Sequence, residues 1–346
     1  MTAYRPKAPV EVYRIMADID DALRISSIQW GRPQMQKMVR ILTFGIVAAF
    51  LSACTDTGLT PGEGYIDVDG GQVWYQIVGS GNATPLLLLH GGPGAPSHYL
   101  KPLERIAVDR PVIFYDQLGA GRSAAPADSS LWTVERFVKE LAQVRTALGL
   151  DEVHILGHSW GSMLAMDYML TEPVGVKSLT FASPALNVRR WTEDARELLK
   201  ALPEDTRALI EHHETEGTTD SPEYQEAVMD FYRMYLSRSD PWSPDLLATF
   251  EAFNTELYGY MWGPSEFTAT GTLRDYNREA DLPELDLPVL FTAGRYDEAT
   301  PETVRHFQSL VPGSEIQIFE NSAHLTMLDE PDVYAEAIRN FLNRVD

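Results

Sequence analysis

The chain has 346 residues but only one cysteine, Cys54, and few positive charges. A single cysteine excludes a disulfide framework within the chain. The 28 lysines and arginines stand against 50 acidic residues, and the net charge of −22 disfavours nucleic acid as a partner because the phosphate backbone is also negative. The sequence also lacks an internal repeat, a low-complexity tract and any cluster of metal ligands at a recognisable spacing. We therefore expect no metal and no cofactor.

The sequence lacks an apolar run long enough to cross a membrane comfortably. The run from Ile41 to Ala53 follows Lys37 and Arg40 and has the length of a signal-peptide core. It ends in Leu51-Ser52-Ala53-Cys54, which resembles a bacterial lipobox, the motif whose cysteine is lipid-modified and becomes the mature N-terminus. We predict a lipoprotein-type signal peptide over residues 35–54, with Cys54 as the lipidation site.

The segments on either side of this signal complete the prediction of location. Signal peptides normally begin close to their basic residues, so we interpret residues 1–34 as a mis-assigned start or a disordered extension, with translation beginning at Met35 or Met38. Residues 55–64 hold Thr, Gly and Pro without periodic apolar residues and are predicted to form a tether. We expect an exported protein that contacts a membrane only through its lipid and faces the periplasm or the cell exterior. The alternative is a cytoplasmic enzyme with an N-terminal extension.

The most informative motif is Gly157-His158-Ser159-Trp160-Gly161, which follows an apolar run and opens a helix-like run. A serine between two glycines can occupy a strand-to-helix turn so tight that only a missing Cβ permits it. The helix N-terminus at the same turn offers unpaired N–H groups to the negative charge that develops in acyl transfer. We predict Ser159 to be a nucleophile.

A serine nucleophile needs a base and an orienting carboxylate, and in this architecture they follow in the order Ser, Asp, His. Asp297 comes after the strand-like run Val289 to Ala293, and His324 comes after the run Ile316 to Phe319. Both therefore lie in loops at the carboxyl ends of strands, where catalytic groups gather in parallel sheets. The predicted catalytic set is Ser159, Asp297 and His324.

A glycine-rich loop upstream supplies the predicted oxyanion hole. The apolar run Pro85 to Leu89 ends in His90-Gly91-Gly92-Pro93-Gly94, where glycines can expose backbone N–H groups. In this class of enzyme one donor is the amide after the nucleophile, here Trp160, and the other comes from this loop, which we assign to Gly92. A phosphate loop is excluded because no Lys-Ser or Lys-Thr pair follows the glycines.

From Gly64 onward the pattern alternates strand and helix and is interrupted once. The alternation predicts a doubly wound, mostly parallel α/β sheet. The interruption is rich in helix formers and in tryptophan and tyrosine. We therefore expect a core over residues 65–184 and 281–346, with an inserted, mainly helical cap over residues 185–280.

Four motifs in order carry a resemblance to a known family: His90-Gly91-Gly92-Pro93-Gly94, the run Asp116 to Ser123, Gly157 to Ser162 and the run Gly294 to Pro301. Together they resemble the proline iminopeptidase family of α/β-hydrolases, which includes the tricorn-interacting aminopeptidase. The resemblance covers the chain from about Gly64 to its C-terminus. It implies the α/β-hydrolase fold and carries the catalytic roles onto Ser159, Asp297 and His324.

The resemblance also implies a site for the substrate amine. The cap motif Trp262-Gly263-Pro264-Ser265-Glu266-Phe267-Thr268 matches the family's, so Glu266 resembles the cap carboxylate that binds the amine. Glu298 resembles its partner, and Tyr258 resembles a nearby tyrosine of the same site. Two carboxylates suit a protonated amine that leaves water, and they would close the pocket to internal peptide bonds.

We therefore expect a serine aminopeptidase that releases N-terminal residues, plausibly proline, from short peptides or amino-acid amides with a free N-terminus through an acyl-enzyme. An amino-acid amidase, esterase or lactonase with the same triad is the alternative, because one catalytic machinery serves all of these reactions. A non-enzymatic lipoprotein that uses the fold for binding is a further alternative, which the complete triad disfavours. The sequence carries no signal for an oligomeric state.

Overall fold

The computed structural model describes residues 58–346. The predicted start region 1–34, the signal peptide 35–54, Cys54 and the first residues of the tether lie outside the described residues. None of the helices in the described part has the length and apolar content needed to span a membrane.

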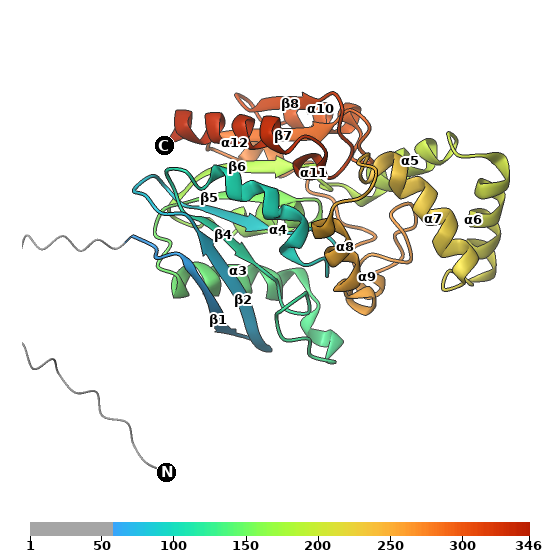
Figure 1. The fold of residues 1–346 in the computed structure, drawn as a ribbon, viewed down its shortest axis with the longest axis horizontal. Helices are drawn as coiled ribbons and strands as arrows, with labels where there is room; N and C mark the ends of the chain where they lie inside the picture. The colour runs from blue at the N-terminus through green and yellow to red at the C-terminus, as the bar shows by residue number, and fades with distance from the viewer. Residues whose placement is uncertain (1–57) are drawn as a thin grey trace, which may run out of the picture. The chain divides into compact units, whose positions relative to one another are not determined.

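Eight strands form one sheet in the order β1-β2-β4-β3-β5-β6-β7-β8 (Figure 1). Pairings that involve β2 are antiparallel, and the six strands from β3 to β8 run parallel. This arrangement confirms the predicted α/β class. The strands are β1 (Gly62–Val68), β2 (Gly71–Val78), β3 (Leu86–Leu89), β4 (Val112–Tyr115), β5 (Val153–His158), β6 (Val176–Ala182), β7 (Val289–Gly294) and β8 (Glu315–Phe319).

The predicted tether ends too late in the sequence. It covers residues 55–64, whereas strand β1 begins at Gly62. Only Ile66 of this strand is buried. An edge strand with one buried side chain does not show the apolar alternation by which strands are identified in a sequence.

Helices cover both faces of the sheet. Leu87 and Leu89 of β3 pack into one apolar cluster and Leu86 and Leu88 into another, as the alternation of side chains along a strand requires. Helices α3, α4 and α10 contribute to the first cluster, and α12 with the 3₁₀ segment Ser97–Ile106 contributes to the second. The core helices are α3 (Val134–Ala147), α4 (Trp160–Met169), α10 (Pro301–Ser309), α11 (Thr326–Asp329) and α12 (Pro331–Val345).

Five helices lie within the segment predicted to be the cap, beyond the carboxyl ends of the parallel strands (Figure 1). Several start at a side chain that accepts a hydrogen bond from the third helical amide, as Asn187, Ser221 and Ser243 do. Proline at the first helical position adds to the start signal in α7 and α8. The helices are α5 (Val188–Leu199), α6 (Glu204–Glu216), α7 (Pro222–Tyr235), α8 (Pro244–Glu251) and α9 (Thr255–Met261).

The cap is joined to the core at its entry and exit. Asn187 and Asn277 form a β-bridge where the chain enters and leaves the cap. Near the exit, Arg278 Nη2 lies 2.6 Å from an oxygen of Asp167 on α4, and the hydroxyl of Tyr276 donates to the other oxygen. The outer helices have a small apolar core of their own, which includes Tyr224, Phe231 and Phe267.

Candidate active site

Ser159 occupies the turn between β5 and α4, with a backbone φ of 55° and ψ of −120°. This is a left-handed conformation that non-glycine residues rarely adopt. The turn needs glycine on both sides: a Cβ on Gly157 would lie 2.3 Å from the carbonyl oxygen of Gly161, and one on Gly161 would lie 2.1 Å from that of Leu89. The sequence motif thus folds as the strained elbow that it predicts.

The predicted base and its orienting carboxylate meet directly. His324 Nδ1 lies 2.8 Å from Asp297 Oδ1. The buried carboxylate also accepts hydrogen bonds from the Ser183 hydroxyl at 2.6 Å and from the Ala299 amide at 2.8 Å. Because Asp297 only accepts, Nδ1 of His324 carries the hydrogen and Nε2 is left to accept a proton.

Ser183 is a member of this group that the sequence analysis missed. Its hydroxyl also lies 3.0 Å from the carbonyl oxygen of His324, and its backbone φ is 47°. It directly follows β6 at the edge of the sheet where Ser159 lies, so its position after the run Val176 to Phe181 is the signal that could have identified it.

Ser159 and His324 line the same cavity but are not yet hydrogen-bonded. Within residues 58–346, no hydrogen bond joins the Ser159 hydroxyl to His324. Nucleophile and base are often loosely aligned without substrate and tighten when the reacting complex forms.

The predicted oxyanion donors are the backbone amides of Trp160 and Gly92. Trp160 is the first residue of α4, and Gly92 has a φ of 105° in the loop after β3. Neither amide donates a hydrogen bond to another group in the part of the chain that the structure describes. Two free N–H groups at a helix N-terminus and a glycine loop are what a developing oxyanion requires.

Two side chains hold this glycine loop. The amide of Gln117 donates to His90 Nε2 at 2.8 Å, and the Gln117 side chain donates to the His90 carbonyl. Gln117 Oε1 in turn accepts from the Trp160 indole at 2.8 Å. Since Nε2 of His90 accepts, its Nδ1 donates to the Gly91 carbonyl at 3.0 Å. Burial lowers the pKa of His90, so the ring stays neutral, with Nδ1 as the donor and Nε2 as the acceptor.

A second chain of hydrogen bonds joins the glycine loop to His324. The Gly91 amide donates to the Tyr99 hydroxyl at 2.7 Å, and that oxygen lies 2.9 Å from His158 Nδ1. His158 Nε2 lies 3.0 Å from the carbonyl oxygen of His324, which can only accept. Nε2 therefore carries the hydrogen, Nδ1 accepts, and Tyr99 donates to it. Burial holds the pKa of His158 well below its ordinary value, so the ring is a neutral link and not a base.

The three residues predicted to bind an amine come together beside His324. The Tyr258 hydroxyl donates to Glu266 Oε1 at 2.6 Å. Glu298 Oε1 lies 3.9 Å from His324 Nε2, and both Glu298 oxygens are buried without a hydrogen-bond partner. The buried hydroxyl of Tyr232, which the sequence analysis did not single out, lies in the field of both carboxylates.

Burial makes this acidic group costly. It raises the pKa of Glu266, and it raises that of Glu298 well above the ordinary value, where the charges of Glu266 and Asp297 add to the effect. A buried carboxylate without a partner costs free energy unless it holds a proton or a cation fills the gap. The arrangement is therefore poised for a cationic group.

The cap contributes further to the placement of His324. The Trp191 ring lies edge-on to the His324 ring, with centroids 5.5 Å apart, and its indole donates to the Glu266 carbonyl at 2.9 Å. The amide of His324 donates to the Tyr235 carbonyl at the end of α7, at 3.0 Å. Asp329 accepts hydrogen bonds from the backbone amides of Arg238 and Ala323, tying the cap to the loop that carries His324.

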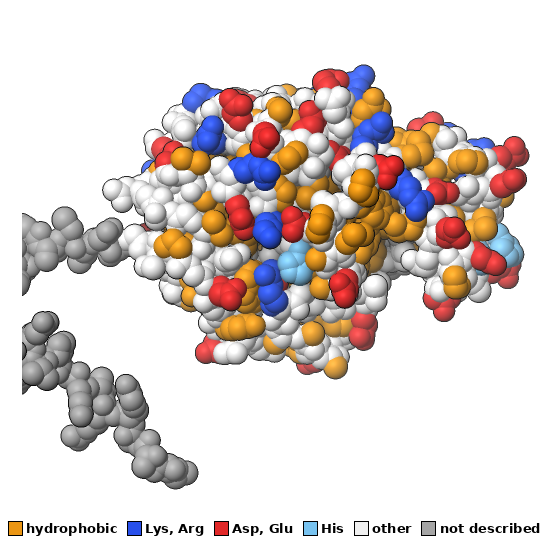
Figure 2. All heavy atoms as spheres, viewed as in Figure 1, with side chains coloured by type: hydrophobic (Ala, Val, Ile, Leu, Met, Phe, Trp, Pro, Cys, Tyr) orange, Lys and Arg blue, Asp and Glu red, His pale blue; other side chains and the backbone are white. Residues whose placement is uncertain are grey.

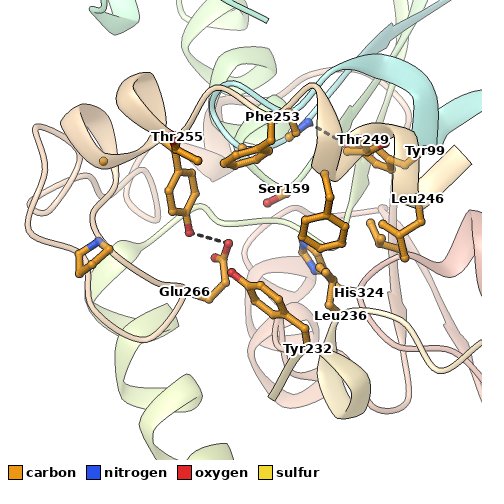
Figure 3. A pocket seen from close by; sticks show the side chains of 18 of the residues that line it. Tyr99, Ser159, Tyr232, Leu236, Leu246, Thr249, Phe253, Thr255, Glu266 and His324 are labelled. Atoms are coloured by element: carbon orange, nitrogen blue, oxygen red, sulfur yellow. Dashed lines mark hydrogen bonds between the residues drawn. The ribbon is translucent and has the colours of Figure 1, made fainter. Parts of the chain in front are cut away.

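Ser159, His324, Glu266 and Tyr258 line a cavity of about 370 Å³ between the core and the cap. Apolar side chains gather where these two parts meet (Figure 2). In the close view, Glu266 and Tyr232 approach from one side of Ser159, and His324 lies on the other (Figure 3). Among residues 58–346, no three side chains of the metal-ligating types are grouped to hold an ion.

Comparison with known proteins gives a consistent result. A family model described as the alpha/beta hydrolase fold matches residues 84–331. A proline iminopeptidase from Heyndrickxia coagulans is 47% identical over 286 residues, which cover 82% of this chain and 99% of that protein. The crystal structure of proline iminopeptidase from Mycobacterium smegmatis matches with a TM-score of 0.75 and 35% identity over 82% of this chain and 98% of that one. The crystal structure of VinJ matches with a TM-score of 0.80 and 34% identity over 83% and 100% of the two chains.

Replacing Tyr99 by phenylalanine is expected to reduce both stability and turnover. The change leaves the Gly91 amide and His158 Nδ1 without their partner, which should cost about 1–3 kcal/mol of unfolding free energy. Loss of alignment between the glycine loop and His324 should lower kcat about ten- to a hundredfold. Thermal unfolding and steady-state kinetics measure the two effects. Tyr65→Phe, at an exposed tyrosine of β1, is the control, and equal behaviour of the two variants would remove the proposed link.

Replacing Glu298 by glutamine is expected to stabilise the fold increasingly as the pH rises. Because the pKa of Glu298 is raised by folding, the folded protein binds more protons than the unfolded chain above about pH 4.5. Stability of the unaltered protein therefore falls as the pH rises toward the folded pKa, and glutamine avoids this loss.

Melting temperatures of the two proteins should converge near pH 4 and separate toward pH 9. The matched control is Glu320→Gln, because Glu320 is an exposed acid and should show no widening difference. Parallel pH profiles for Glu298→Gln and the unaltered protein would contradict the buried, partnerless state of this carboxyl.

Proposed function

The chain belongs to the proline iminopeptidase family of α/β-hydrolases, and from this membership we propose that it is a serine aminopeptidase that releases N-terminal residues, with proline preferred, from short peptides. The observation that carries the proposal is the buried Glu298 carboxylate, which has no partner and lies beside Glu266 and the base. A substrate ammonium group supplies the missing cation.

Chemistry begins at Ser159. As the hydroxyl oxygen attacks the scissile carbonyl carbon, His324 Nε2 takes its proton and the carbonyl oxygen becomes an oxyanion. The Gly92 and Trp160 amides donate to this oxyanion, and Asp297 keeps the imidazole in the required tautomer and stabilises its positive charge. His324 then protonates the leaving nitrogen as the C–N bond breaks, which leaves the N-terminal residue as an ester on Ser159.

Hydrolysis of this ester repeats the steps with water. His324 takes a proton from the water, the resulting oxygen nucleophile adds to the ester carbon, and the proton returns to Ser159 as the free amino acid departs. Side chains and backbone amides of this chain provide every proton transfer and charge contact in these two steps.

Recognition of the amine explains why such an enzyme would act on chain ends. A free N-terminal amine, primary or prolyl, is protonated near neutral pH and can pair with Glu266 and Glu298. An internal peptide bond has a neutral amide nitrogen at that place and would leave both carboxylates unpaired. That penalty, and not a steric wall alone, favours an exopeptidase over an endopeptidase.

We also propose that Cys54 carries a lipid and that the enzyme is exported, facing the periplasm or the cell exterior. Support comes from the basic residues, the apolar run and the lipobox-like ending that precede this cysteine in the sequence.

Replacing Glu266 by glutamine should impair cleavage of free-amine substrates far more than cleavage of neutral esters. Loss of one charged partner from the amine should cost about 2–5 kcal/mol of transition-state binding, roughly thirtyfold or more in kcat/KM. Prolyl, alanyl and other aminoacyl anilides are compared with their acetylated forms and with simple esters, using the protein truncated before Thr55.

The same comparison separates the aminopeptidase from an amidase, esterase or lactonase. Unaltered protein that cleaves acetylated anilides or simple esters as well as free-amine anilides would contradict the proposed function. Ser159→Ala sets the background and should lower every activity by at least about a thousandfold while the protein remains folded.

Replacing Cys54 by serine in the full chain should move the enzyme from the membrane fraction to the soluble fraction. Lipid attachment requires the cysteine thiol, so the hydroxyl cannot substitute for it. Fractionation of expressing bacteria and mass measurement of the N-terminal peptide follow the change. A soluble, unmodified protein with Cys54 intact would contradict the lipid anchor.

A further inference from the structure

The cavity around Ser159 has two ends of opposite character. Glu266 lies on one side of Ser159, and Leu246 lies on the other, beyond His324 (Figure 3). Leu236 and Thr249 line the same cavity. We call the second end the apolar wall and define it by Leu236, Leu246, Phe250 and Leu325, all of which line the cavity.

The apolar wall belongs to a different part of the protein interior from the amine end. Its four residues pack in the cluster that also holds Tyr99, whereas Tyr258 and Trp191 belong to the cluster on the opposite face of the sheet. Leu236 and Leu325 are held in register because the Leu325 amide donates to the Leu236 carbonyl at 2.8 Å. The wall is thus built jointly by the cap and by the loop that carries His324.

The position of the wall matches the direction of the substrate chain. In an N-terminal residue the scissile carbon is two bonds from the amine, so an amine paired with Glu266 presents the carbonyl carbon of that same residue to Ser159. The leaving nitrogen receives its proton from His324, and the wall lies beyond His324 as seen from Glu266 (Figure 3). The leaving group, which begins at this nitrogen, therefore extends toward the wall.

The size of the cavity leaves room for more than the N-terminal residue. Its volume of about 370 Å³ lies within the range of clefts that hold ligands larger than one amino acid. The remaining space suits a medium-sized side chain on the leaving group.

Charge around the cavity restricts that occupant further. Asp220 and Glu266 are the acids among the lining side chains, and the described residues that line the cavity include no lysine or arginine. A dipeptide would place its terminal carboxylate next to the wall, away from water and without a cation. An amide, or a longer peptide whose carboxylate lies outside, avoids this cost.

We propose that the apolar wall is a leaving-group subsite that takes a large apolar, uncharged group. The favoured substrates are peptides or amides with a leucine- or phenylalanine-like second residue, in preference to dipeptides with a free carboxylate. This inference rests on the proposed aminopeptidase function and adds the second substrate residue to it.

The test measures release of free proline from a series that differs only after the scissile bond: Pro-Gly-NH₂, Pro-Ala-NH₂, Pro-Leu-NH₂, Pro-Phe-NH₂ and the free acid Pro-Leu. Burial of a leucine side chain should raise kcat/KM of Pro-Leu-NH₂ over Pro-Gly-NH₂ about ten- to a hundredfold. The kcat/KM of Pro-Leu-NH₂ should also exceed that of the free acid Pro-Leu at least about tenfold.

A matched pair of variants tests the wall itself. Leu246 is 1% exposed and faces the cavity, whereas its neighbour Leu247 is 54% exposed and does not line it. Leu246→Ala should reduce the preference for Pro-Leu-NH₂ over Pro-Gly-NH₂ at least about fivefold, and Leu247→Ala should keep it. If Leu246→Ala does not fold, Leu236→Ala takes its place, because Leu236 is only half-buried.

A gain of activity provides a second test. Thr249 lines the cavity beside the wall, and Thr249→Lys would supply the cation that the free carboxylate lacks. The variant should reduce the ratio of kcat/KM for Pro-Leu-NH₂ to kcat/KM for the free acid Pro-Leu about tenfold.

The outcomes separate this subsite from the function on which it rests. Equal kcat/KM across the series would overturn the subsite and leave the aminopeptidase standing. The subsite is also overturned if Leu246→Ala alters the ratio of kcat/KM between prolyl and alanyl substrates that share one leaving group, but leaves the preference for the second residue unchanged. Failure to release proline from any of the compounds, with esters still cleaved, would overturn the proposed function and the subsite with it.

Discussion

The placement of His324 is the constraint on which the rest of the site depends. Its Nδ1 is fixed by Asp297, its carbonyl oxygen accepts from His158 and lies 3.0 Å from the Ser183 hydroxyl, and its amide donates to Tyr235. These partners come from the loop after β7, from β5, from the end of β6 and from the cap. A base held through its ring and its backbone at once cannot drift while Ser159 approaches, and the core and the cap can separate only by breaking a bond to it.

Charge in the site is arranged so that binding relieves a cost of folding. Asp297 is surrounded by donors, whereas Glu298 next to it in the chain has none. The first carboxylate is therefore ready for its task before substrate binds, and the second is satisfied only by a proton or by a cation from outside. The free energy that the unpaired Glu298 costs the folded protein is recovered when a substrate amine binds. Active sites commonly lower stability in this way for the sake of function.

Sequence reasoning predicted the parts of this site that depend on local pattern. The elbow at Ser159 and the strand ends before Asp297 and His324 have signatures within a few residues of the functional side chain. Ser183 has only its position directly after β6 as a signal, and Tyr99 and His158 have none that reveals their roles, since those depend on contacts between segments far apart in the chain. The start of strand β1 was not predicted, for a different reason. At the sheet edge this strand buries only Ile66, so its composition resembles that of a tether.

The two ends of the cavity act as one selector because they lie on opposite sides of a single reacting bond. The acidic end rewards a positive charge, and the apolar wall with no cation beside it penalises a negative one. A substrate that reverses its direction would place its amine against Leu246 and its apolar side chain against Glu266, leaving both ends unsatisfied. Polarity along the cavity therefore sets the orientation of the chain before Ser159 attacks, and that orientation brings the leaving nitrogen to His324, which protonates it.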